Sequence, residues 1–200
     1  MTQLLLPDFV QHPLPEKALH LCETLNAPLR LVAHLTLVHD VACQIVTAFP
    51  QLFPGAVFDP NLVLFGAATH DLGKARFPQE LEQSGELHED HGPDLLISLG
   101  VAPELARFAR THAAWKQENT RSTLLFEDLL VGLADNWWKG NRPPELEQAI
   151  LNHLETQTQT AAWELFIRLD ELAQTITHPA QERLDWMRSF PVQPPIPNSK

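Results

Sequence analysis

A histidine and an aspartate, His70 and Asp71, follow each other at the end of the apolar run LVLFGAAT, residues 62–69. The run is typical of a buried helix, so the pair closes an element that we expect in the core. Burying polar groups without partners costs about 2–7 kcal/mol by transfer estimates. Imidazole and carboxylate groups are good metal ligands, and a bound ion would give the pair a partner. The pair therefore predicts a metal site at the end of a buried helix.

The periodicity of the chain predicts an all-α fold. Apolar side chains recur at helical spacing, and no stretch shows sustained period-two alternation of β-branched residues. Several expected helices begin at a proline, which suits the first helical turn. We expect helices over residues 15–26, 28–49, 61–73 (with Asn61 as a cap), 88–99, 103–115, 124–138, 143–177 and 179–190, and a loop over 75–87.

The length of 200 residues fits a single domain, which we place at residues 1–190. The C-terminal helices, residues 143–190, are expected either to cover the core or to build a homodimer contact. Residues 191–200 form a proline-rich tail that we expect to be disordered.

Charge and cysteine content narrow the classes of partner and compartment. The net charge of −11 disfavours a nucleic-acid duplex, because Lys and Arg dominate contacts to its backbone. A small anionic molecule is compatible with this charge if bound cations supply positive charge locally. Cys22 and Cys43 lack CxxC spacing, so we expect no disulfide framework and a cytoplasmic location. No apolar run approaches ~20 residues, so we expect neither export nor a membrane span.

A second histidine interrupts the apolar face of the helix expected at 28–49. His34 shares the stripe of Leu31 and Val38, so it should point inward. Taken alone, it is more readily explained as a core histidine bonded to a carbonyl. His39 lies five residues further on, a rotation of ~140°, so we expect His39 and Asp40 to face solvent.

Two later segments offer further imidazoles. His112 interrupts the apolar face that Leu105, Phe108 and Ala109 form. His88 and His91 could both face the core at the start of their helix, and their spacing alone does not choose between them.

A further carboxylate closes the apolar run at 129–134. Asp135 could be a ligand, with Asp128, two turns earlier, as the alternative. If Asp135 has only a structural role, we expect it to form an ion pair with Lys139 at i+4. Inward histidines and aspartates on several separate helices are hard to explain by structure alone.

The order of these residues resembles the HD-domain superfamily of metal-dependent phosphohydrolases. The resemblance covers about residues 28–142, which would form the core of an HD-type helical bundle. The family places a histidine four residues before a glycine, which selects His88 over His91. HDLGK with an upstream His and a downstream Asp is the strong part of the match. The matching segments are LVAH (31–34), ATHDLGK (68–74), HEDHG (88–92), TH (111–112) and LAD (133–135).

The resemblance implies one or two divalent metal ions, with Asp71 bridging them. The implied activity is hydrolysis of a phosphoester or phosphoanhydride in a small metabolite, with a nucleotide as the expected class and hydroxide held by the ions as nucleophile. The ligand types do not choose among Fe, Mn, Co, Ni, Zn and Mg. The GYP signature of the branch that acts on cyclic dinucleotides is absent. The implied metal ligands are His34, His70, Asp71, His88, His112 and Asp135.

Basic residues near these ligands are candidates for contacting phosphate. The resemblance includes Lys74, which we expect to act in catalysis with Asp71 and to bind substrate. Lys139 and Arg142 would share one face with Asp135 if the helix continues, so we also expect them to bind substrate. Their alternative role is to complement the charge of a helix C-terminus.

The sequence also offers weaker candidates for substrate binding and two alternative functions. Arg110 is a weaker phosphate ligand, and Trp115, Trp137 and Trp138 could stack a base, although packing is the commoner role of such aromatics. Some HD-type proteins with this ligand set use a di-iron centre for oxygen-dependent cleavage. A non-catalytic nucleotide-binding module is the third interpretation.

Overall fold

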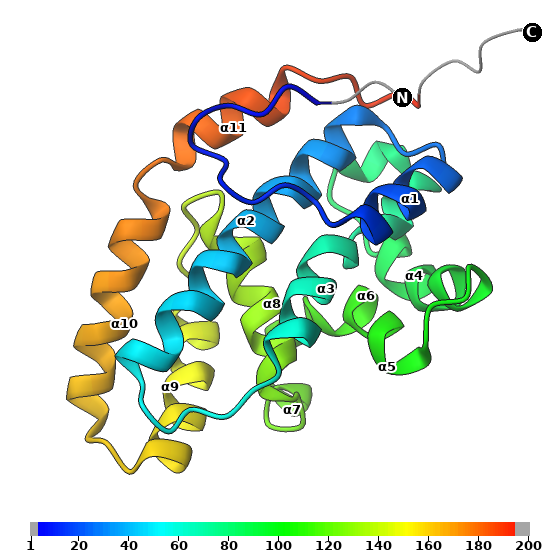
Figure 1. Cartoon of the computed structure of the whole chain (residues 1–200). Coiled ribbons are helices and arrows are strands. Elements are labelled where there is room, and N and C mark those ends of the chain that lie inside the picture. The colour runs from blue at the N-terminus through cyan, green and yellow to red at the C-terminus, as the bar shows by residue number, and fades with distance from the viewer. Residues whose placement is uncertain (1–3, 195–200) are drawn as a thin grey trace, which may run out of the picture.

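The computed structural model describes residues 4–194, and within that range it contains helices and no β-strand. This confirms the all-α fold class. Figure 1 shows α2 running through the middle of the molecule, with α10 and α11 along one side of it. The helices are α1 (Glu16–Thr24), α2 (Leu29–Leu52), α3 (Pro60–Thr69), α4 (Leu87–Ser98), α5 (Pro103–Ala106), α6 (Phe108–Thr111), α7 (Glu118–Arg121), α8 (Phe126–Trp137), α9 (Pro144–Thr158), α10 (Ala162–Thr177) and α11 (Ala180–Arg188), with 3₁₀ turns η1 (Leu72–Ala75), η2 (Pro78–Leu81) and η3 (Ala114–Lys116).

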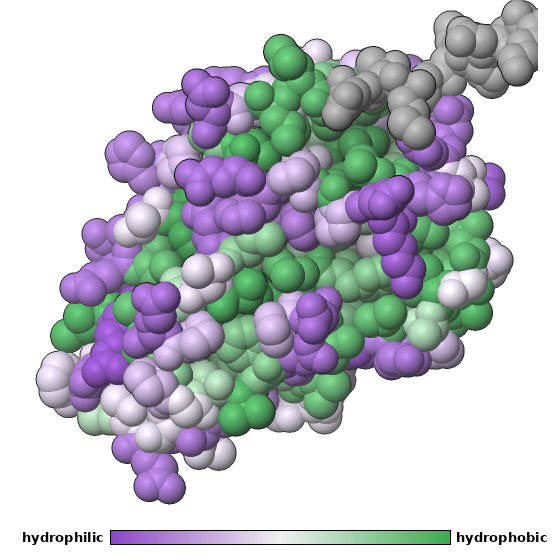
Figure 2. All heavy atoms as spheres, in the orientation of Figure 1, coloured by the Kyte–Doolittle hydropathy of each residue, from purple (hydrophilic) through white to green (hydrophobic). Residues whose placement is uncertain are grey.

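Helix α2 is apolar enough to qualify as a membrane span by length and composition alone. Its most apolar window has a mean hydropathy of 1.4, yet 72% of that window is buried inside the protein. The central helix of a compact core meets the same criterion. We expected no segment apolar enough to span a membrane, and α2 corrects that expectation. On the face that Figure 2 shows, polar and apolar side chains alternate over the surface.

The helix that carries the His-Asp pair ends earlier than expected. It spans Pro60–Thr69 and η1 follows it, in place of one helix over 61–73. Its cap is Asp59, whose carboxylate accepts a hydrogen bond from the main-chain nitrogen of Asn61 at 2.8 Å. Asn61 is therefore the donor in this cap and not the capping residue.

Two of the longer helices that we expected are each divided into shorter elements. The helix expected at 103–115 is broken into α5, α6 and η3, although no glycine or proline marks the breaks. The region expected at 143–177 is divided between α9 and α10 by Gln159, whose φ of 55° is left-handed. The segment expected as a loop at 75–87 contains η2.

The buried apolar side chains form two clusters, which meet along α2. The larger cluster joins the C-terminal part of α2 to α3, α8, α9 and α10. The smaller cluster joins the N-terminal part of α2 to α1, α4, α5 and α6. Ile150, Leu154 and Leu169 belong to the larger cluster, so the C-terminal helices cover the core. The opposite side of α10 leaves Trp163 and Phe166 exposed.

His39 and Asp40 do not face solvent, and that expectation is wrong: their exposed fractions are 5% and 0%. The N-terminal segment covers this face of α2, and the main-chain nitrogens of Gln11 and His12 donate to the Asp40 carboxylate at 3.0 and 2.9 Å. Arg183 of α11 is buried as well. Burial lowers the pKa of Arg183, and the charge of Asp40 opposes that shift. The helical period placed these residues on a second face of α2 without indicating what covers that face.

The C-terminal end of the described chain is held against α2 through Arg30. Its main-chain nitrogen donates to the carbonyl of Pro191 at 3.2 Å. Its guanidinium donates to the carbonyls of Phe190 and Arg188 at 2.7 and 3.0 Å. The tail expected to be disordered therefore begins at an anchored residue, and its residues 195–200 lie outside the described range.

Replacing Asp40 by alanine should lower the free energy of unfolding by about 3 kcal/mol, because Arg183 loses an opposing charge and two main-chain amides lose their acceptor. Urea unfolding measures this change. Asp94→Ala removes the same charge at an exposed position of α4 and should cost less than about 0.5 kcal/mol. Equal losses in the two variants would contradict a stabilising role for Asp40.

Candidate metal centre

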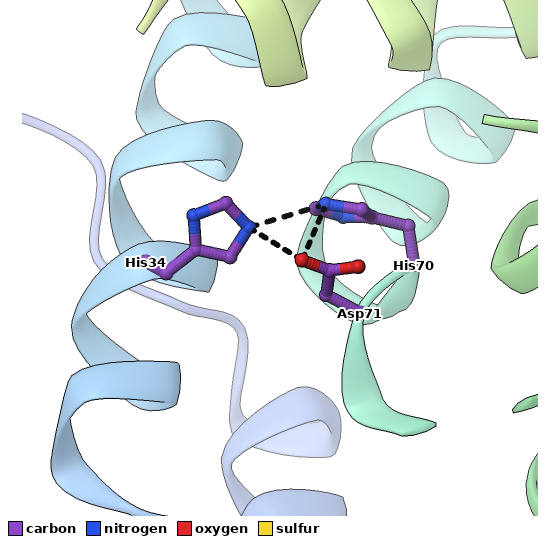
Figure 3. Close-up of side chains that lie close together, drawn as sticks. All are labelled: His34, His70 and Asp71. Carbon is purple, nitrogen blue, oxygen red and sulfur yellow. Dashed lines mark hydrogen bonds and ion pairs between the residues drawn. The ribbon is translucent and has the colours of Figure 1, made fainter. Parts of the chain in front are cut away.

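Three side chains meet where α3 ends beside α2. His34 projects from α2, and His70 and Asp71 directly follow α3 (Figure 3). The Nε2 atom of His34 lies 2.9 Å from Oδ2 of Asp71 and 3.3 Å from Nε2 of His70. Their exposed fractions are 7% for His34, 0% for His70 and 1% for Asp71. Because their ligand atoms all lie within 4.8 Å of one another, this first group could hold a metal ion.

Two more histidines approach the other oxygen of Asp71. His88 lies in the first turn of α4, and His112 directly follows α6. Their Nε2 atoms lie 3.1 and 3.7 Å from Oδ1 of Asp71. These three residues form a second group whose ligand atoms also lie within 4.8 Å. Asp71 thus offers one oxygen to each group, as a bridging carboxylate would.

Asp135 reaches the first group from α8. Its Oδ1 atom lies 3.7 Å from Nε2 of His34 and 3.7 Å from Nε2 of His70. The indole of Trp138 donates to the same oxygen at 3.3 Å, and the ammonium of Lys139 lies 3.3 Å from the other oxygen. The ion pair with Lys139 therefore exists together with a position beside the histidines. The structure brings together all the implied ligands: His34, His70, Asp71, His88, His112 and Asp135.

Main-chain acceptors fix which nitrogen carries the proton on two of the imidazoles. Nδ1 of His70 lies 3.0 Å from the carbonyl of Ala67, and Nδ1 of His112 lies 3.0 Å from the carbonyl of Phe108. A carbonyl only accepts, so Nδ1 carries a proton in both rings and each ring turns its Nε2 atom toward the cluster. Metal-binding histidines are oriented by a hydrogen bond from the other ring nitrogen in the same way.

The carboxylate of Asp71 has too few donors around it. Among the described residues, none donates a hydrogen bond to its buried Oδ1 atom, while Nζ of Lys74 lies 2.5 Å from Oδ2. Burial raises the pKa of Asp71, but neighbouring charge, above all that of Lys74, outweighs burial and holds it well below its usual range. A buried carboxylate oxygen without a donor calls for a cation. The residues present therefore fit a divalent metal ion.

Two glycines allow the elements of the site to approach closely. A Cβ atom on Gly73 would lie 2.5 Å from the carbonyl oxygen of His88, so glycine is needed where α4 begins against η1. A Cβ atom on Gly132 would lie 2.7 Å from the carbonyl oxygen of His112, where α8 packs against that turn. The glycine of HDLGK is thus a packing requirement of the site.

A pocket of about 380 Å³ opens over both groups of ligands. The cluster residues line it, except for His70, which has no exposed surface. Lys74, Lys116 and Lys139 line the same pocket. Positive side chains and potential metal ligands therefore face one cavity.

The tryptophans offer little surface for stacking a base. Trp115 and Trp138 line the pocket but are only 7% and 3% exposed. Trp137 is fully buried, and its indole donates to Glu147 at 3.1 Å. All three side chains pack against protein, as the alternative interpretation expected.

Two expected phosphate ligands do not reach the pocket. The chain turns at Gly140, whose φ is 78°, so the helix does not continue to Arg142. The guanidinium of Arg142 instead lies 2.8 Å from Glu147 and 2.7 Å from Asp170, and the expectation that it binds substrate does not hold. Arg110 donates to the carbonyl of Asp90 at 3.0 Å and also lies outside the pocket lining.

The two alternative metal ligands, His91 and Asp128, lie outside the cluster. His91 is exposed and lies beside the ring of Phe77, so His88 is the histidine that joins the cluster. The carboxylate of Asp128 accepts hydrogen bonds from Arg107 and Thr111 at 3.0 and 2.8 Å, which is a structural role.

Sequence reasoning missed Glu80, whose Oε2 atom lies 2.6 Å from Nδ1 of His88. It is one of several acidic residues in the segment expected to be a loop, and no spacing distinguished it. Lys116 of the pocket, at the end of η3, was also missed, because no spacing linked it to the ligands.

No family model, curated protein or solved structure matches this chain. The donor set itself, four imidazoles and two carboxylates, is typical of sites for Fe, Mn, Co, Ni or Zn.

Removing a central ligand should remove bound metal. His70→Ala and Asp71→Ala should each lose it, because these residues are the middle of the cluster. His39→Ala is the matched control, since it deletes a buried imidazole from the other face of α2. Elemental analysis of the purified variants measures the result, and equal metal content in all three would contradict the assignment.

Acid should destabilise the metal-free protein through His112. Burial lowers the pKa of this imidazole to about 3 in the folded protein, from an ordinary value of 6.5. Between these pH values the unfolded chain binds a proton that the folded protein does not. The free energy of unfolding therefore decreases as the pH is lowered, by up to about 1.4 kcal/mol per pH unit. Urea unfolding with a chelator present should show a flatter pH dependence for His112→Gln. An identical pH dependence in both proteins would contradict a buried neutral imidazole.

Proposed function

We propose that this protein is a metal-dependent phosphohydrolase of the HD type that acts on a small phosphorylated metabolite, with a nucleotide as the expected class. The observation that carries the proposal is the pair of donor groups that share Asp71 beneath a pocket that three lysines help to line. Two divalent ions in such a site would lower the pKa of a water molecule and polarise the phosphoryl oxygen under attack.

The cluster residues divide naturally between two ions. His34, His70 and Asp135 would hold one ion together with Asp71, and His88 and His112 would hold the other. A shared carboxylate keeps two ions close, which is the arrangement used in two-metal hydrolysis of phosphoesters.

The lysines supply the contacts that a phosphate requires. Burial lowers the pKa of Lys74, but the charge of Asp71 outweighs it and raises the pKa, so the ammonium stays charged. Lys74 and Lys139 form ion pairs with Asp71 and Asp135. Ions at these carboxylates would compete for their charge and leave both ammonium groups available to phosphate oxygens. Lys116, exposed at the same pocket, adds a third positive charge.

A screen of nucleotides and sugar phosphates for phosphate release, with Mn, Co, Ni, Fe and Mg supplied in turn, should reveal metal-dependent turnover. Asp71→Ala should reduce turnover to background because both ions lose a ligand. Lys74→Ala should lower kcat/KM by about 10²-fold, the typical cost of deleting one charge-stabilising donor. Arg110→Ala removes a positive charge outside the pocket and should leave kcat/KM unchanged.

Two other results would replace the proposal. Oxygen consumption by a protein loaded with two irons, without phosphate release from any substrate, would favour a di-iron oxygenase. Tight nucleotide binding without turnover under all metals would favour a non-catalytic module.

A further inference from the structure

Glu80 makes three contacts to the start of α4. Its side chain is only 5% exposed. Its Oε2 atom lies 2.6 Å from Nδ1 of His88 and accepts the main-chain N–H of His88 at 3.1 Å. Its Oε1 atom accepts the main-chain N–H of Leu87 at 3.1 Å. Both the backbone and the ring of His88 are therefore held by this one carboxylate.

These contacts replace an ordinary helix cap. The N-cap position of α4 is Glu86, which makes no capping hydrogen bond with its side chain. The first amides of a helix have no partner within the helix, so another acceptor must satisfy them. Glu80 does so from seven and eight residues upstream of the two amides, and the intervening chain folds back over its carboxylate.

His88 differs in this respect from other imidazoles of the cluster. His70 and His112 direct their Nδ1 atoms to main-chain carbonyls, which no substitution can delete. His88 depends on a side chain from η2, outside its own helix. Residues 80–86, the wall segment, also line much of the pocket. The orientation of His88 is therefore tied to the wall of the substrate pocket.

We propose that Glu80 is the positioning residue of the second metal ion: it accepts the Nδ1 proton of His88 and so directs the Nε2 atom of that ring toward Asp71. Nε2 of His88 lies 3.1 Å from the otherwise unpartnered Oδ1 atom of Asp71. Carboxylates behind metal-binding imidazoles fix the ring and its tautomer, and their loss typically weakens metal binding 10–100-fold. The inference rests on the metal centre of the proposed function.

Gly85 gives independent support. A Cβ atom at this position would overlap Oε1 and Cδ of Glu80, so glycine allows the wall segment to close over the carboxylate. The substitution Gly85→Ala should therefore displace Glu80 without altering any charge or any cluster residue.

Titration of the metal-free full chain with Zn²⁺ should resolve two sites in the parent protein. Glu80→Gln should weaken one of them 10–100-fold and leave the other unchanged, and Gly85→Ala should have the same effect. Glu82→Gln is the matched control, because it removes the same charge two residues away from an exposed side chain that pairs with Arg30. This control should keep both affinities.

A second measurement separates positioning from a merely structural role. Nitrogen-15 NMR at pH 9 should place the proton of His88 on Nδ1 in the parent protein. Glu80→Gln should shift it toward Nε2, while circular dichroism shows unchanged helix content. The inference would be overturned if Glu80→Gln kept both zinc affinities of the parent protein. A single zinc site in the parent protein, or an unaltered His88 tautomer in Glu80→Gln, would also overturn it.

The two proposals fail in different ways. A parent protein that binds two ions, loses one with Glu80→Gln and hydrolyses nothing would reject the phosphohydrolase and support the role of Glu80. A protein that hydrolyses phosphate and keeps both ions in Glu80→Gln would do the reverse.

Discussion

The buried carboxylate of Asp71 determines how the surrounding helices must be arranged. It is ionised, 1% exposed, and lies within 3.7 Å of Nε2 atoms from α2, from α4 and from the turn after α6. Lys74 pairs with one oxygen of this carboxylate, but the other, Oδ1, is buried without a hydrogen-bond donor, which is costly unless a cation lies beside it. The free energy that holds them in place comes from the two apolar clusters, which pack on either side of the site along α2. The hydrophobic core thus stabilises a polar centre that is unfavourable without a bound cation.

The abrupt end of α3 explains how two adjacent residues reach one point. Consecutive side chains on an α-helix point about 100° apart, so a continuing helix would separate His70 from Asp71. His70 keeps helical angles, φ −52° and ψ −37°, whereas Asp71 leaves them at φ −100° and ψ 8°. The change of direction brings both side chains toward His34, and Gly73 then admits the backbone of His88.

Sequence patterns located those parts of the structure that depend on local periodicity. The stripe of apolar residues on α2 indicated the inward direction of His34, and the apolar runs before Asp71 and Asp135 indicated the ends of buried helices. The same reasoning misplaced His39 and Asp40, because a helix with two covered faces shows no solvent-facing side. The segments that cover the second face, around Gln11 and Arg183, are distant in sequence, and no local pattern links them to α2. Glu80 was missed for a related reason, since its role depends on a fold-back within an irregular segment.

Each group of ligands has a second carboxylate besides Asp71. Asp135 faces the imidazoles of the first group, and in the second group Oε1 of Glu89 lies 3.8 Å from Nε2 of His88. Glu80 differs from both, because it lies behind His88 and acts through the ring. Direct charge attracts a cation more strongly than charge relayed through an imidazole, because Coulomb energy falls with distance. Glu80 should therefore affect the second ion mainly by orienting His88. The affinity of the second group should depend on how the pocket wall positions Glu80, which links the side of the pocket that meets substrate to the metal centre.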